Sequence, residues 1–228
     1  LTTDCFTATE DFGSSGLRWQ EDSSWGDFYV TTLTTYSGAA NLRNALIYSD
    51  NIYFAKAALK IGGSNFADAL KKIGFGKEMD FPIAMSESQF GSNNEFTSNS
   101  DLANSGYGQG KVLVNPLHVA SIYSAFVNDG NMIKPHIEYS EETEYWIEDA
   151  FTEDAADEIR DDLIQVVNSP NGTGYEARIS GVTIAGKTGT AELKSSKDEH
   201  GEELGWFNAI VMSDEEDEQL LTINMIEN

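Results

Sequence analysis

The sequence predicts an α+β fold with helices in the middle of the chain and an antiparallel sheet at its end. Two observations lead to this prediction. Apolar residues recur at helical spacing within residues 41–135 and again within 153–168, whereas the last part of the chain contains three short β-type runs. A short acidic turn separates the last two runs, as expected for an antiparallel hairpin and not for alternating β-α-β units.

The length, composition and net charge of the chain limit the class of protein to which it can belong. The chain has 228 residues, 40% of them hydrophobic, and a formal net charge of −24. This length allows one large domain or a core with an inserted subdomain, and the negative charge argues against nucleic acid or an anionic membrane surface as partner. The single cysteine, Cys5, cannot form an internal disulfide, and no stretch is long enough to span a membrane. Because Leu1 is not an initiator methionine, we expect the chain to belong to a longer protein.

The first half of the chain predicts helices after an irregular lead-in. Residues 1–40 show no lasting period and are interrupted by glycine and serine. Residues 41–135 predict a mostly helical subdomain, with two helices meeting near Ser49 and a third from Ser64 to Gly74. At that junction Ser49 can cap the second helix with its side chain, which is an ordinary structural role for serine.

The middle of the chain combines a loop and the clearest helix. Residues 75–111 are rich in glycine, serine and asparagine, and predict a long surface loop of the kind that is often functional or mobile. Asn115 and Pro116 then supply a cap and a first-turn proline for a helix that Gly130 closes.

Residues 136–228 predict one helix followed by C-terminal antiparallel strands. The helix runs from about Glu153 to Asn168, and the strands are expected at 182–188, 204–212 and 220–226.

The candidate functional residues lie in two short motifs, Ser49-Asp50-Asn51 and Lys187-Thr188-Gly189-Thr190. Acyl transfer needs a nucleophile, a proton shuttle and donors aimed at the developing oxyanion. A serine and an asparagine at a helix junction can relay a proton and orient a substrate amide, while the lysine favours a bound carboxylate. The glycine lets a ligand lie flat against the strand. The predicted catalytic residues are Ser49, Asn51, Lys187 and Thr190, the last through its backbone N–H, and the predicted substrate-binding residues are Asp50, Thr188 and Gly189.

No metal site or cofactor is predicted. His118, His136 and His200 do not have the spacing of metal ligands. The acidic run at 214–218 predicts a solvated hairpin tip in preference to a calcium site.

Several ordered blocks carry a family resemblance: 19–26, 48–55, 106–110, 115–120, 172–174, 185–194 and 205–207. On these blocks the chain resembles the transpeptidase domain of class B, or monofunctional, penicillin-binding proteins. It is most similar to the low-affinity branch that includes the methicillin-resistance enzyme of staphylococci. The resemblance implies the fold shared by penicillin-binding proteins and serine β-lactamases, with an all-helical subdomain beside the sheet.

The resemblance also implies an activity. The protein would be a D,D-transpeptidase that cross-links peptidoglycan stem peptides through a serine acyl-enzyme and binds β-lactam antibiotics. It would lie on the extracytoplasmic face of the bacterial membrane, held by an N-terminal anchor absent from this sequence, with other cell-wall synthesis proteins as possible partners. Ser49 and Asn51 would relay protons and contact substrate, Lys187 and Thr188 would bind the carboxylate, and Thr190 would contribute to the oxyanion hole.

One family motif is missing. No serine, threonine or cysteine stands three residues before any lysine, so the chain has no Ser-x-x-Lys nucleophile motif. We expect that motif to precede Leu1 in the longer protein, and these 228 residues alone to be inactive. The alternative is a non-catalytic sensor or pseudoenzyme that binds β-lactams or wall peptides. A β-lactamase is disfavoured because no residue resembles a dedicated deacylating base.

Overall fold

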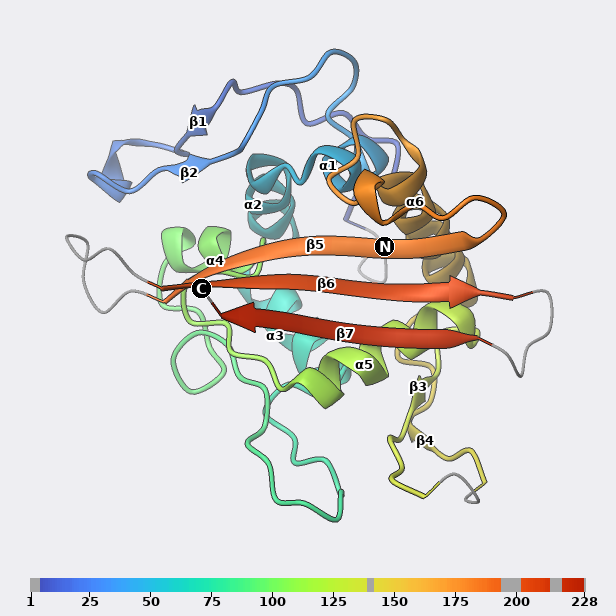
Figure 1. The fold of residues 1–228 in the computed structure, drawn as a ribbon. Helices are drawn as coiled ribbons and strands as arrows, with labels where there is room; N and C mark the ends of the chain where they lie inside the picture. The colour runs from blue at the N-terminus through green and yellow to red at the C-terminus, as the bar shows by residue number, and fades with distance from the viewer. Residues whose placement is uncertain (1–4, 139–141, 194–201, 214–218, 228) are drawn as a thin grey trace.

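The protein is built on a three-stranded antiparallel sheet, with helices behind, above and below it (Figure 1). The computed structural model describes residues 5–138, 142–193, 202–213 and 219–227. The strand order is β5-β6-β7, so that β5 (Thr183–Leu193) and β7 (Leu220–Glu227) form the two edges and β6 (Glu202–Met212) lies between them. Helices before an antiparallel C-terminal sheet confirm the predicted α+β class.

Strand β5 is longer than the sequence predicted. The sequence predicts an end at Thr188, whereas pairing with β6 continues from Thr183 opposite Met212 to Leu193 opposite Glu202. Gly189 does not stop the strand, because a glycine keeps both backbone groups that a sheet needs and lacks only the side chain. The whole Lys-Thr-Gly-Thr motif therefore lies within a regular edge strand.

Six α-helices are present in the described part of the chain: α1 (Leu42–Tyr48), α2 (Asn51–Ile61), α3 (Gly63–Lys72), α4 (Asn99–Ser105), α5 (Pro116–Ser124) and α6 (Glu153–Asn168). The bounds of α6 agree with the prediction. The Thr152 side chain accepts a hydrogen bond from the Ala155 N–H, and acidic residues fill the first turn of the helix, as its dipole favours. Its buried face includes Leu163, Val166 and Val167, which pack toward the sheet and α1.

Shorter elements connect these helices and strands. The two-residue strands β1 (Arg18–Trp19) and β2 (Val30–Thr31) pair in the lead-in, and β3 (Met132–Ile133) pairs with β4 (Tyr145–Ile147) at the lower right of Figure 1. The 3-10 turns are η1 (Ser23–Trp25), η2 (Ala125–Val127) and η3 (Tyr175–Ala177).

The predicted loop at 75–111 is wrong in part. Helix α4 lies within it, capped by Ser98, whose side chain accepts a hydrogen bond from the Asp101 N–H. A seven-residue helix is too short to show a clear hydrophobic period, so only the capping serine signalled it. An isolated bridge between Gln89 and Leu113 also joins the segment before α4 to the segment after it.

The predicted end of the helix that starts after Asn115 is also wrong. Helix α5 stops at Ser124 and a 3-10 turn follows, well before Gly130. The Ser124 hydroxyl donates to the Ser121 carbonyl and accepts from the Ile133 N–H, which ties the last turn to β3. Gly130 instead allows a close backbone approach, because its φ is +86° and a Cβ there would lie 2.2 Å from the Phe151 carbonyl oxygen.

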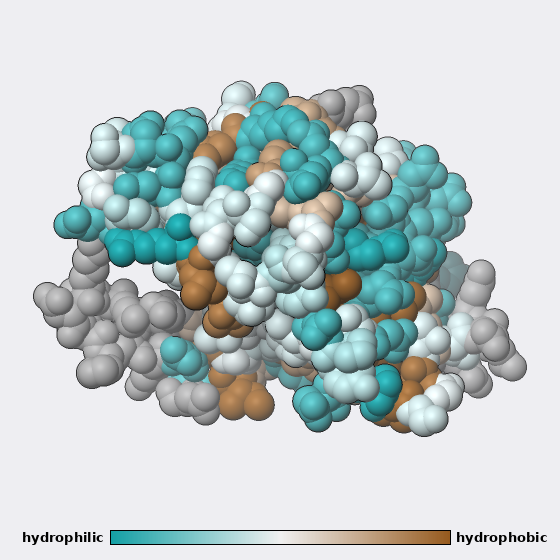
Figure 2. All heavy atoms as spheres, turned by 90° about the horizontal axis from the view of Figure 1, so that it is seen from above, coloured by the Kyte–Doolittle hydropathy of each residue, from teal (hydrophilic) through white to brown (hydrophobic). Residues whose placement is uncertain are grey.

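One face of the molecule can be judged by its hydropathy. Seen from above, it is mainly hydrophilic, and apolar residues appear only in small separate groups (Figure 2). Among the described residues, no helix has both the length and the apolar character needed to cross a bilayer.

Candidate functional site

The junction between α1 and α2 presents Ser49. Its backbone is left-handed, with φ +54°, and it ends α1. The structural alternative for Ser49, a cap on the second helix, does not hold. Asp50 is the cap, because its Oδ1 accepts hydrogen bonds from the N–H groups of Ile52 at 2.9 Å and Tyr53 at 3.3 Å. The left-handed turn leaves the Ser49 hydroxyl free for a contact outside the helices.

That contact is with Lys187 on β5. The Lys187 Nζ donates hydrogen bonds to the Ser49 Oγ and to the Thr188 carbonyl oxygen, each at 2.9 Å. The structure therefore brings together the two motifs that the sequence singled out, across 138 positions of the chain. Ser49 and Lys187 are both half-buried, so their hydrogen bond is only partly screened by solvent.

The Lys187 ammonium has no carboxylate partner among the residues that the structure describes. Burial lowers the pKa of Lys187 from 10.5 to about 8, because desolvation disfavours the charged amine. Near pH 8 the Lys187 amine therefore populates both its protonated and its neutral form. Protonated, it can attract an anion; neutral, it can accept a proton through the Ser49 hydroxyl.

The free edge of β5 presents backbone groups next to this lysine. The Thr190 carbonyl accepts a hydrogen bond from the Gln109 Nε2 at 2.9 Å, and the Thr188 carbonyl accepts one from Lys187. Since the N–H and C=O of one strand residue point to the same side, the Thr190 N–H also faces this edge. This orientation is the one that an oxyanion-hole donor requires.

Two other predicted site residues have different partners. The Asn51 Nδ2 donates to the Thr31 carbonyl at 2.9 Å, on the side of the lead-in. The second oxygen of Asp50 accepts from the Tyr36 hydroxyl at 2.8 Å, and Asp50 is only 8% exposed. The surroundings of Asp50 thus favour a structural role, and a substrate contact for either residue stays a prediction.

Sequence reasoning missed three residues that touch this site. Tyr36 stacks on Tyr48 with ring centroids 4.4 Å apart and also binds Asp50, yet nothing in its local sequence signals this. Gln109 and Thr173 both contact β5 and lie in glycine-flanked blocks that had served only to establish the family resemblance. The glycines were the available signal, because they allow a loop to approach a strand closely.

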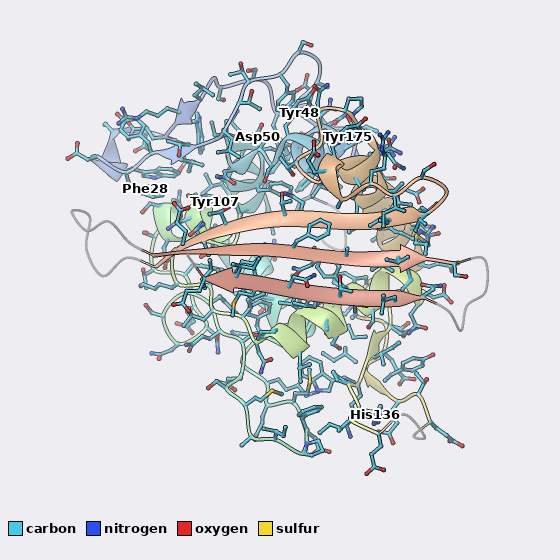
Figure 3. The ribbon with its side chains drawn as sticks, viewed as in Figure 1. Phe28, Tyr48, Asp50, Tyr107, His136 and Tyr175 are labelled. Carbon is cyan, nitrogen blue, oxygen red and sulfur yellow. The ribbon has the colours of Figure 1, made fainter. Side chains whose placement is uncertain are left out.

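A cleft of about 780 Å³ lies beside the motif. Its walls include Tyr107, Gln109, Tyr123, Lys187, Gly189 and Trp206. Figure 3 shows Tyr48, Asp50 and Tyr175 above β5 and Tyr107 near the left end of the sheet, whereas His136 lies far below them. Lys187 and Gly189 line this cleft and also belong to the edge strand β5.

Within the described ranges, no group of three or more histidine, cysteine or acidic side chains is arranged to hold a metal ion. The His118 ring nitrogen Nε2 bonds the Ile73 carbonyl at 2.8 Å, and burial lowers the pKa of this histidine. His200 and the acidic run at 214–218 lie outside the described residues.

Comparisons with known proteins identify the family. The family model described as "Penicillin binding protein transpeptidase domain" matches residues 1–228. Penicillin-binding protein 3 of Bacillus subtilis is 41% identical over 216 residues, which are 93% of this chain and 32% of that protein. A probable peptidoglycan D,D-transpeptidase of Pseudomonas aeruginosa is 31% identical over 156 residues, which are 68% of this chain and 27% of that protein. The chain thus spans about a third or less of the length of these relatives.

The fold agrees with this assignment. Penicillin-binding protein A of M. tuberculosis, solved as a ceftriaxone acyl-enzyme complex, matches with a TM-score of 0.77 at 20% identity, over 92% of this chain and 49% of that chain. Together with the family model that matches the whole sequence, the edge strand and helix junction described above lead to one conclusion: the chain belongs to the penicillin-binding protein transpeptidase family.

Proposed function

We propose that the protein to which this chain belongs is a D,D-transpeptidase that cross-links peptidoglycan stem peptides and is acylated by β-lactams. The observation that carries this proposal is the hydrogen bond between Lys187 and Ser49, at the free edge of a strand that also presents Thr188 and Thr190. The names of the relatives support it.

The geometry suggests how these residues act. An extended peptide can lie along the free edge of β5, where the missing side chain of Gly189 leaves room for it. Its terminal carboxylate would bind Lys187 and the Thr188 hydroxyl. The Thr190 N–H would stabilise the oxyanion, and Ser49 with Lys187 would move the proton. The attacking serine would come from a Ser-x-x-Lys motif elsewhere in the longer protein, so we expect these 228 residues alone to form no acyl-enzyme.

The finer expectations from the sequence belong to the same proposal. We place the protein on the extracytoplasmic face of the membrane, anchored by another segment of the longer chain, with other cell-wall synthesis proteins as partners. We also place it in the low-affinity branch of class B enzymes, on the blocks of sequence that it shares with that branch.

The test is covalent labelling. The full-length gene product is incubated with a fluorescent penicillin, and adducts are detected by intact mass and mapped by peptide analysis. We expect one adduct on a serine outside these 228 residues, formed at least about a hundredfold more slowly in Lys187→Ala because a positioned proton-transfer group is lost. Lys71→Ala, an exposed lysine on α3, is the matched control and should label like the wild type.

The alternative is a sensor or pseudoenzyme that binds β-lactams or wall peptides without chemistry. The absence of a Ser-x-x-Lys motif from this sequence favours it. Reversible binding of the penicillin by a folded full-length protein, with no adduct at any time, would replace the transpeptidase proposal with this one.

A further inference from the structure

A tight turn follows α6 and touches both halves of the site. The turn covers residues 172–174, with a glycine on either side of Thr173. A Cβ on Gly172 would lie 2.0 Å from the Val166 carbonyl oxygen, so only glycine allows this approach to the end of α6. The Gly174 N–H also bonds the Val166 carbonyl, at 3.3 Å. The end of α6 therefore fixes the position of Thr173.

Thr173 links the helix that ends at Ser49 to the strand that carries Lys187. Its backbone N–H donates to the Ile47 carbonyl at 3.1 Å, two residues before Ser49 in the chain. Its side chain accepts a hydrogen bond from the Thr188 hydroxyl, with the two Oγ1 atoms 2.8 Å apart. The backbone of Thr173 is thus held at α1, while its hydroxyl reaches the side chain that follows Lys187.

We propose that Thr173 is a positioning residue that orients the Thr188 hydroxyl toward the carboxylate of the ligand. This inference rests on the proposed function. In the free protein Thr188 donates to Thr173. When a carboxylate accepts the Thr188 hydrogen, the Thr173 hydroxyl turns and donates to the Thr188 oxygen, since each hydroxyl can donate one bond and accept others.

The reversal has two consequences for recognition. The Thr188 oxygen keeps a hydrogen-bond partner in both states, so its rotamer stays fixed and no polar atom loses its partner when the ligand binds. A donor behind the Thr188 oxygen also polarises its O–H bond and strengthens the bond to the carboxylate. Thr173 should therefore matter more for ligands that carry a carboxylate than for ligands that offer a neutral carbonyl at this position, because a charged acceptor forms the stronger hydrogen bond.

The experiment compares Thr173→Val, which keeps the shape but loses the hydroxyl, with Thr173→Ser, which keeps the hydroxyl. Acylation of the full-length gene product is timed by intact mass with benzylpenicillin and with its methyl ester. We expect Thr173→Val to slow acylation by the acid about tenfold, the equivalent of one net hydrogen bond. Acylation by the ester should slow much less, because its neutral carbonyl accepts a weaker hydrogen bond from Thr188. Thr173→Ser should restore the rate for the acid.

Other outcomes overturn the inference. Equal slowing with acid and ester would make Thr173 a merely structural link, and unchanged rates would give it no role. If Thr173→Val does not fold, Thr173→Ala provides the second hydroxyl-free variant.

A wild-type protein that forms no adduct contradicts the proposed function and not this inference. The deciding measurement is then the dissociation constant of an acyl-D-alanyl-D-alanine peptide and of its C-terminal amide. Weaker binding of the acid alone in Thr173→Val supports the inference, and equal binding of acid and amide by the wild type overturns it.

Discussion

Lys187 makes two hydrogen bonds in the site, yet it has no ion-pair partner in the described part of the chain. A buried amine without a carboxylate loses hydration and gains little in return, so its pKa falls. A structural lysine is normally paired or solvated. The unpaired lysine beside a serine in a left-handed turn is therefore the feature at the residue scale that best indicates function.

The lowered pKa predicts a pH-dependent stability difference. Lys187 titrates at about 8 when folded and near 10.5 when unfolded, so between these values the unfolded state binds more protons. The free energy of unfolding of the wild type should therefore rise relative to Lys187→Met as pH increases from 8 to 10.5. We expect a relative gain of about 1–3 kcal/mol. Urea denaturation of both proteins at about pH 7 and about pH 10 measures it, and a difference that does not change with pH would contradict the burial of the amine.

At the scale of elements, the junction between α1 and α2 depends on which residue caps the second helix. Asp50 and Ser49 are both good capping residues, and the local sequence does not choose between them. The structure chooses Asp50, since Ser49 is used in the left-handed turn that ends α1. This division of roles frees the Ser49 hydroxyl for Lys187.

Asp50→Ala should destabilise this junction. It removes the acceptor for the N–H groups of Ile52 and Tyr53 and leaves the Tyr36 hydroxyl without its partner. We expect a loss of about 2 kcal/mol in the free energy of unfolding. Asp50→Asn, whose amide oxygen can still cap the helix, should lose less than half of this. Equal losses by urea denaturation would show that the charge, and not the cap, is what matters.

At the scale of the whole molecule, the sheet has two open edges among the described residues, and they differ in character. The edge of β5 faces the site, whereas β7 carries exposed apolar side chains, including Met225 at 50% and Ile226 at 66% exposure. An exposed apolar edge strand offers unpaired backbone groups to another strand. The net charge of −24 opposes such pairing and is screened by salt.

The 228-residue chain should therefore self-associate in a concentration-dependent way that strengthens with salt. Ile226→Lys places a charge on the edge and should shift the chain toward monomer without changing its stability, because the side chain is exposed. Sedimentation velocity at several protein and salt concentrations measures this. If the wild type stays monomeric at high salt, the chain does not self-associate through β7. If Ile226→Lys associates as strongly as the wild type, β7 is not the contact between chains.

The fold class and the bounds of α6 could be predicted from the sequence alone. The sequence also singled out the two motifs that meet through Ser49 and Lys187, although the catalytic roles of their residues stay predictions. The predicted helix and strand follow from local physics: an apolar period over sixteen residues fixes a helix, and Lys-Thr-Gly after a β-type run fixes a strand with an open face. It failed where the signal was short or ambiguous. Helix α4 is too short to show a period, and capping preference cannot separate Ser49 from Asp50.

Which residues meet follows only from the packing of segments that are distant in the sequence. Lys187 reaches Ser49 because α6 packs against both α1 and β5, and the turn at Thr173 owes its place to the close approach of Gly172 to Val166. The low pKa of Lys187 is likewise a product of packing, since burial comes from segments distant in the sequence. The type of a residue determines which chemistry its side chain can perform. The partners of that side chain, and the extent to which it is removed from water, depend on how distant elements pack together.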